Sequence, residues 1–208
     1  MIVLSHRGYW KTLQERNSFE AFERSFNMGF GTETDLRDYN GEIVIAHDMP
    51  KGNERTFEEL LVIMKGRNLP LALNIKADGL YEKIKSKLEK YNHTNYFTFD
   101  MSIPDMVCHL KNKLKVFTGL NDLLIQPVLL SECEGVWLDC FNSDWYDWSV
   151  IDNLLGQGKK VCLVSAELHK RENLNQWSII KKSKFLHSDN LLICTDFPEK
   201  AREYFNEN

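Results

Sequence analysis

The sequence predicts an α/β protein with the architecture of a (β/α)8 TIM barrel. Short apolar runs alternate about eight times with amphipathic segments along the 208 residues. Repeated strand–helix units imply parallel strands, because each crossover must be long and right-handed. The chain is short for this fold, which typically has about 250 residues, so we expect short loops. A doubly wound open sheet is the alternative, but no G-x-G-x-x-G motif follows the first strand.

The first half of the chain has clear boundary signals. Residues 2–5 are a β-rich run, and residues 18–30 form a helix that Ser18 is placed to cap. Residues 31–48 indicate two strands around the turn signal Asn40-Gly41. Further strands are expected at 69–76 and 95–102, and further helices at 56–67, 79–91 and 103–113.

The second half repeats the same alternation. Residues 122–130 predict a short helix or turn that Pro127 interrupts. Strands are expected at 114–120, 134–141, 159–166 and 190–196, and helices at 148–158, 173–183 and 198–205. No low-complexity tract or linker divides the chain, so residues 1–208 are expected to form a single domain.

Composition excludes several classes of protein. The net charge of −4 argues against a nucleic-acid partner, which would favour a basic surface. No window contains eighteen consecutive apolar residues, so we expect no membrane span. The first residues have neither a basic stretch nor a long apolar one, and the five cysteines form no C-x-x-C pair. A cytoplasmic protein with reduced thiols is expected.

Polar residues end most of the predicted strands, where the active sites of βα barrels lie. Glu33 and Asp35 are two apart on a strand, so their carboxylates share one face. Such a pair suits one hard divalent ion, Mg²⁺ or Ca²⁺. Three other predicted strands also end in candidate residues. These are His6, Arg7 and Gly8 at the first, His47 and Asp48 at the second, and Asn74 and Lys76 at the third.

These residue types together favour phosphodiester chemistry. A histidine exchanges protons near neutral pH, so His6 and His47 are candidate general acid and base. The arginine fork of Arg7 suits phosphate oxygens, and Gly8 permits close approach of a ligand. Arg7 could instead form an ordinary salt bridge with Glu33.

The chain resembles the glycerophosphodiester phosphodiesterases. The motifs that carry the resemblance are SHRG, RNSFEAF, ETD, IVIAHD, LNIK and CTDFPEKAREYF. The family's members are (β/α)8 barrels of lipid metabolism that cut small-molecule glycerol phosphodiesters with two histidines and a metal–carboxylate site. The resemblance implies that His6 and His47 are catalytic, that Arg7, Lys76 and Asn17 bind phosphate, and that Glu33, Asp35 and Asn74 bind the metal.

The chain departs from the family pattern at three places. Arg16 replaces the acid that precedes the family's asparagine, and Asn74 stands where the family has a third metal carboxylate. An asparagine carbonyl can still bind Ca²⁺ or Mg²⁺, but with one charge less. The family's capping insertion after the second histidine is missing, so we expect a more open site.

Alternative functions stay open at this point. The same site would suit a nucleotide-linked or surface-polysaccharide diester, or a phospholipase-like reaction. A catalytically weak barrel that binds a phosphorylated ligand is a further alternative. Trp137 and Asp139 are candidates for a substrate pocket, although tryptophans more often serve packing. His93, His109, His169 and His187 are expected at the surface.

Overall fold

The structure is a computed structural model that describes residues 1–206. It confirms the predicted fold class, a (β/α)8 TIM barrel. Nine strands form the sheet in the order β5-β4-β2-β1-β9-β8-β7-β6, and β3 pairs with β2 outside this path. Contacts divide the chain into an N-terminal unit, Ser5–Val116, and a C-terminal unit, Met1–Leu4 with Phe117–Asn208. The expectation of a single domain without a capping insertion stays a prediction.

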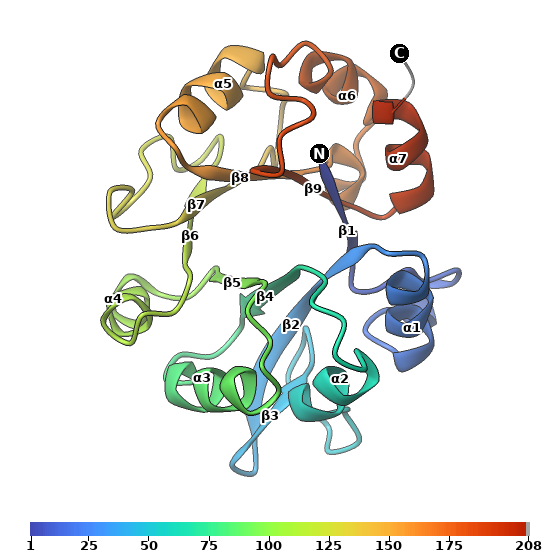
Figure 1. The fold of residues 1–208 in the computed structure, drawn as a ribbon, viewed down its shortest axis with the longest axis vertical. Helices are drawn as coiled ribbons and strands as arrows, with labels where there is room; N and C mark the ends of the chain where they lie inside the picture. The colour runs from blue at the N-terminus through green and yellow to red at the C-terminus, as the bar shows by residue number, and fades with distance from the viewer. Residues whose placement is uncertain (207–208) are drawn as a thin grey trace. The chain divides into compact units, whose positions relative to one another are not determined.

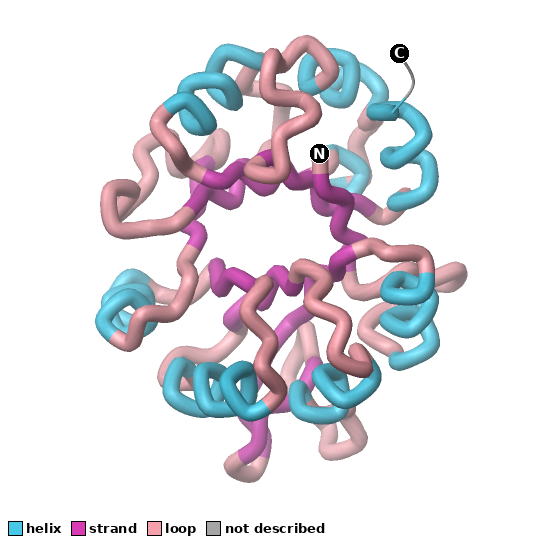
Figure 2. Tube along the Cα trace, in the orientation of Figure 1, coloured by secondary structure: helices cyan, strands magenta, loops and turns pink. Residues whose placement is uncertain are grey.

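The N-terminal unit alternates strands and helices after the first strand, β1 (Ile2–His6) (Figure 1). Its helices are drawn on one side of its strands (Figure 2). The strands are β2 (Gly31–Tyr39), β3 (Glu42–Ile45), β4 (Leu71–Ile75) and β5 (Tyr96–Phe99). The helices are α1 (Phe19–Asn27), α2 (Phe57–Ile63), α3 (Tyr81–Lys90) and α4 (Ile103–Lys111), with a 3₁₀ turn at Leu13–Glu15.

Helices α1, α2 and α4 begin within one residue of the predicted positions, and α3 begins two residues after its predicted start. The Ser18 hydroxyl accepts from the amide of Ala21 (3.2 Å) and caps α1, whose Phe22 and Phe26 are buried. Thr56 and Glu59 form a reciprocal capping box at α2. These caps satisfy amides that no helical carbonyl can reach, which fixes where each helix begins.

A tight hairpin folds β3 back along β2. Asn40 and Gly41 both have positive φ, 48° and 85°, as a two-residue turn matching the strand twist requires. The register pairs Leu36 with Ile45, and beyond β3 the amide of Ala46 donates to the Asp35 carbonyl (3.0 Å). The chain after β3 therefore returns to the carboxylate-bearing part of β2.

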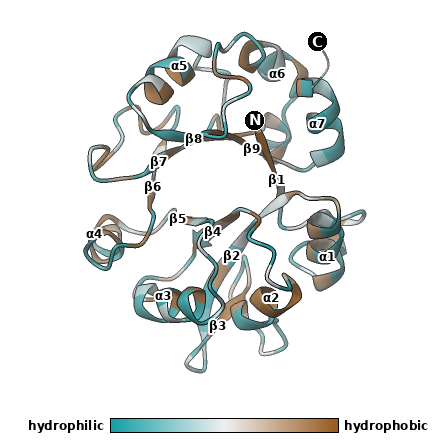
Figure 3. Ribbon diagram, viewed as in Figure 1, coloured by the Kyte–Doolittle hydropathy of each residue, from teal (hydrophilic) through white to brown (hydrophobic). Residues whose placement is uncertain are grey.

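The C-terminal unit has the same alternation of strands and helices, and β9 is mostly hydrophobic (Figure 3). Its strands are β6 (Phe117–Leu120), β7 (Gly135–Leu138), β8 (Lys160–Val164) and β9 (Leu191–Thr195). Its helices are α5 (Trp148–Gly156), α6 (Leu174–Ile180) and α7 (Pro198–Asn206), with a 3₁₀ turn at Ala166–His169. Residues 122–130 contain bends and a turn but no helix, and Asn121 Oδ1 accepts from the amides of Leu123 and Leu124 at the start of this segment.

Two histidines expected at the surface are buried. His109 has no exposed area, and its Nδ1 lies 3.0 Å from the hydroxyl of Thr98 on β5. His93 is 6% exposed, with its Nε2 3.1 Å from the carbonyl of Asn95. The expectation was wrong for both because each ring has a polar partner that lowers the cost of burial. No helix among the described residues is long and apolar enough to cross a membrane, and all five cysteines are free thiols.

Candidate functional site

The turn after β1 is shaped by two residues with positive φ, Arg7 (58°) and Gly8 (80°). The amide of Arg7 donates both to the carbonyl of Glu33 (3.0 Å) and to its carboxylate (3.2 Å). A Cβ at Gly8 would lie 2.8 Å from the Cβ of Ala21, so only glycine fits against α1. The turn thus fixes the arginine beside the carboxylates of β2.

Glu33 and Asp35 lie on the same face of β2, as the spacing predicted, and are almost fully buried at 2% and 0% exposure. Burial, together with the charge of Asp35, raises the pKa of Glu33 well above its usual value. The Nε2 of His6 lies 3.9 Å from Oε2 of Glu33. The structure therefore brings the first histidine to the carboxylate pair.

Asp35 is the centre of the local charge network. Arg7 Nε lies 3.1 Å from its Oδ2, and Lys76 Nζ lies 3.7 Å from its Oδ1. Asn17 donates from Nδ2 to Oδ2 (3.0 Å). The guanidinium of Arg7 thus pairs with Asp35, and only the backbone amide of Arg7 bonds to the Glu33 carboxylate.

Asn17 is held as part of this network, and Ser18 takes the capping role. Asn17 has a positive φ of 59°, and its amide donates to the carbonyl of Arg7 (2.9 Å). Its Oδ1 accepts from the hydroxyl of Thr34 (3.0 Å), while its Nδ2 reaches Asp35. Backbone strain of this kind persists where the surroundings hold it, often at functional sites.

His47 is brought to the same region through Arg37, which sequence reasoning missed. Arg37 donates from Nε to the carbonyl of His47 (3.1 Å) and from Nη1 to the carbonyl of Lys76 (3.1 Å). The His47 ring is bonded through Nδ1 to Asp48 (2.8 Å). Arg7 also helps to lower the pKa of Asp48, after the larger effects of His47 and against the opposing effect of burial. A signal was present in the sequence, since Arg37 shares the β2 face of Asp35.

The oxygen atoms on β2 and β4 fit a divalent cation. The register places Asp35 opposite Asn74, so the two side chains leave neighbouring strands side by side. Within residues 1–206, Oδ1 of Asp35 and Oδ1 of Asn74 are both buried without a hydrogen-bond partner. No cluster of three His, Cys, Asp or Glu side chains suited to a metal occurs in the described chain. Glu33, Asp35 and Asn74 could supply oxygen ligands only, with one negative charge less than three carboxylates.

The two candidates for a substrate pocket, Trp137 and Asp139, lie in the C-terminal unit and are largely buried. Trp137 is 7% exposed on β7, and Asp139 is 5% exposed just beyond it. Oδ1 of Asp139 bonds to Nε2 of His169 (2.7 Å) and accepts from the amide of Cys140 (2.6 Å). The partly exposed His169 was missed, because thirty residues separate it from Asp139 and no local pattern links them.

Comparisons with known proteins support the fold and its resemblance to phosphodiesterases. No family model matches the chain, and neither does any curated protein. A glycerophosphodiester phosphodiesterase from Agrobacterium tumefaciens is similar in structure, with a TM-score of 0.70 at 13% identity over 98% of this chain and 99% of that chain. A phosphodiesterase from Oleispira antarctica, solved with the product sn-glycerol-3-phosphate, has a TM-score of 0.69 at 15% identity over 100% of this chain and 97% of that chain. A Ca²⁺-dependent phosphatidylinositol-specific phospholipase C from Streptomyces antibioticus has a TM-score of 0.60 at 11% identity over 99% of this chain and 96% of that chain.

Proposed function

We propose that the protein is a metal-dependent phosphodiester hydrolase that acts on a glycerophosphodiester-type substrate. The observation that carries the proposal is the convergence of Arg7 and Lys76 on the buried Asp35, beside Glu33 and the ring of His6. This arrangement has three components. The cations can bind a phosphate, the carboxylates can bind a metal, and the histidine can transfer a proton. The similarity in fold to two phosphodiesterases agrees with it.

Arg7 and Lys76 are proposed to bind the phosphate. The side chains of both are about one-fifth exposed, 19% and 22%, while their partner Asp35 is buried. A phosphodiester therefore has access to the two cations from the solvent side. The guanidinium fork would hold two phosphate oxygens, and the lysine would act as a point charge. Together they would stabilise the negative charge that builds up during hydrolysis.

The two histidines are proposed to transfer protons. An ionised Asp48 carboxylate can only accept, so Nδ1 of His47 carries the proton and Nε2 of a neutral ring keeps its lone pair. His47 is thereby prepared to take a proton from the attacking water or hydroxyl. His6 beside Glu33 would then donate one to the departing alcohol, although the opposite assignment uses the same atoms.

Glu33, Asp35 and Asn74 would hold the proposed metal, one Mg²⁺ or Ca²⁺. A bound divalent ion would polarise a phosphoryl oxygen and neutralise its charge. The two buried oxygens without hydrogen-bond partners support this proposal, and the Ca²⁺-dependent phospholipase C is a neighbour in fold.

A phospholipase-like reaction is the second candidate, favoured by that same neighbour. A phosphodiester joins two alcohols to one phosphate, and the two activities differ in which alcohol is released. Parallel assays with a deacylated glycerophosphodiester and with a phospholipid in detergent micelles distinguish them. Hydrolysis of the deacylated substrate alone supports the first proposal, and hydrolysis of the micellar substrate alone supports the second.

The basic test is turnover of a chromogenic phosphodiester with Mg²⁺ or Ca²⁺, and with EDTA. The proposal predicts turnover that EDTA abolishes and that added metal restores. Turnover that persists in EDTA contradicts the metal requirement. Absence of turnover under all conditions, with binding of glycerol phosphate retained, identifies a binding barrel instead.

A further inference from the structure

Two cations already match the negative charge around Asp35 without a metal. Arg7 and Lys76 contribute two cations, each within 4 Å of Asp35. Asp35 and the buried Glu33 together contribute at most two negative charges to match them. Asn74, opposite Asp35 in the register, adds no charge. A divalent ion entering this set alone would bring two uncompensated positive charges next to the arginine and the lysine.

Arg7 and Lys76 do not use all of their hydrogen-bond donors in their contacts with Asp35. Arg7 Nε lies near Asp35 but makes no hydrogen bond to any described residue. Lys76 Nζ is 3.7 Å from Oδ1 of Asp35, beyond ordinary hydrogen-bond distance, and that oxygen also has no hydrogen-bond partner in the described chain. Arg7 Nε and Lys76 Nζ therefore lie against Asp35 as ion pairs, and both groups could turn to a better acceptor.

We infer that a divalent cation and a phosphate ligand bind this site cooperatively, each raising the affinity for the other, because Asp35 exchanges Arg7 and Lys76 for the metal. A phosphate would draw the two cations from Asp35 and leave its oxygens for a metal. A metal on Asp35, Glu33 and Asn74 would in turn release the cations for phosphate. The inference rests on the proposed function and concerns the regulation of the same site.

Asn74 sets the strength of this coupling. A carboxylate at this position would make the site negative before any ligand arrives. A divalent ion would then bind without the help of phosphate, and the two binding events would become more independent. The amide adds no negative charge to the ligand-free site, so that metal and substrate are taken up together.

The test is isothermal titration calorimetry with Ca²⁺ and sn-glycerol 3-phosphate, each alone and each in the presence of the other. Coupling between sites is typically about 5- to 150-fold, and we expect at least about tenfold in the wild type. Reciprocity requires the same factor in both directions. Equal affinities with and without the second ligand overturn the inference.

The variant Asn74→Asp tests the charge argument. It should bind Ca²⁺ alone about tenfold more tightly and show a smaller coupling factor. The matched control is Asn153→Asp on the exposed side of α5, which adds the same charge and should leave both affinities unchanged. If Asn74→Asp leaves the coupling factor at its wild-type value, the proposed role of the charge balance is overturned.

The same titrations separate this inference from the proposed function. Independent binding of Ca²⁺ and glycerol phosphate overturns the inference and leaves the hydrolase proposal standing. Cooperative binding without turnover of any diester supports the inference and contradicts the hydrolase. Binding of neither ligand overturns both.

Discussion

Arg37 bonds to the carbonyl of His47 through Nε at 3.1 Å. The same guanidinium donates to the carbonyl of Lys76 at 3.1 Å, so one side chain joins the turn after β3 to the end of β4. It bonds to the backbone carbonyls of two residues that are proposed to act on the substrate. Arg37 is therefore a positioning residue for the proposed chemistry.

Replacing Arg37 with Met should lower activity more than stability. Loss of both bonds frees the backbone of His47, and misplacement of a reacting group by about 1 Å can cost about 100-fold in rate. We expect kcat/KM to fall about 10- to 100-fold. The measurement is steady-state turnover of a chromogenic diester alongside Tm. Arg55→Met, which removes a surface pair with Glu59, is the control. Unchanged kcat/KM in Arg37→Met contradicts the role.

The variants His6→Asn and His47→Asn should distinguish the acid from the base. Each should lose about 10²- to 10⁴-fold in kcat, the usual contribution of a general acid or base. A p-nitrophenolate leaving group needs no protonation, so the variant that lacks the general acid should recover much of its rate on that substrate. The comparison of alkyl and p-nitrophenyl diesters measures this. Equal losses on both substrates for both variants would rule out the division of roles.

Buried His109 should make folding stability depend on pH. Burial lowers the pKa of His109 below its usual 6.5, and the nearby Asp105 carboxylate (3.2 Å) only partly opposes this. The imidazole of His109 therefore binds a proton more readily in the unfolded chain than in the folded one. As a result, the free energy of unfolding falls as pH decreases below about 6.5. His109→Gln should flatten that decrease between about pH 6.5 and 5 in urea unfolding. The control is His187→Gln, at an exposed position. A decrease as steep as in the wild type would contradict this account.

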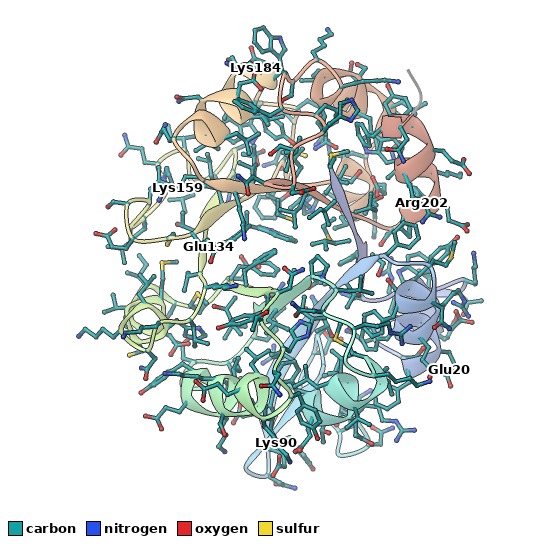
Figure 4. The ribbon with its side chains drawn as sticks, in the orientation of Figure 1. Glu20, Lys90, Glu134, Lys159, Lys184 and Arg202 are labelled. Atoms are coloured by element: carbon teal, nitrogen blue, oxygen red, sulfur yellow. The ribbon has the colours of Figure 1, made fainter. Side chains whose placement is uncertain are left out.

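Glu58 should stabilise the pairing of α2 with α3 at neutral pH but not in acid. Lys87 (2.9 Å), Tyr91 (2.9 Å) and Lys90, labelled in Figure 4, bond to its carboxylate. These bonds lower the pKa of Glu58 from 4.5 to about 2. Its contribution is present above pH 4.5 and is lost as pH falls towards 2.

The variant Glu58→Gln measures this contribution. Its Tm should lie below the wild-type value at pH 7, and the difference should narrow as the pH is lowered from 4.5 towards 2, because protonated glutamate resembles glutamine. Glu203→Gln on α7 is the exposed control. A difference in Tm that is constant from pH 7 to 3 would show that the charge of Glu58 does not stabilise the fold.

Features of the structure that residues close together in the sequence form could be predicted from local sequence patterns. The spacing of Glu33 and Asp35 gave their common face, and Asn40-Gly41 gave the hairpin. The Ser18 cap and the Thr56 capping box were also predictable, because each involves residues within a few positions of one another. The strand–helix alternation was sufficient for the fold class.

Contacts between distant segments were not predictable from the same patterns. The choice of Asp35 as the partner of Arg7 depends on side-chain geometry that spacing does not contain. The bond between His169 and Asp139 joins two connecting segments of the C-terminal unit. The buried His109 depends on Asp105 one helical turn away and Thr98 on β5, a combination that needs the tertiary fold.

The polar groups at β1, β2 and β4, together with His47 after β3, are proposed to hydrolyse a phosphodiester. Phosphorus NMR of a deacylated glycerophosphodiester, incubated with the protein and Ca²⁺ or Mg²⁺, tests it most directly. We expect the diester resonance to be replaced by that of glycerol phosphate, and the His6→Asn/His47→Asn double variant to leave the diester intact. Conversion by the double variant at the wild-type rate would show that these two histidines do not carry out the hydrolysis.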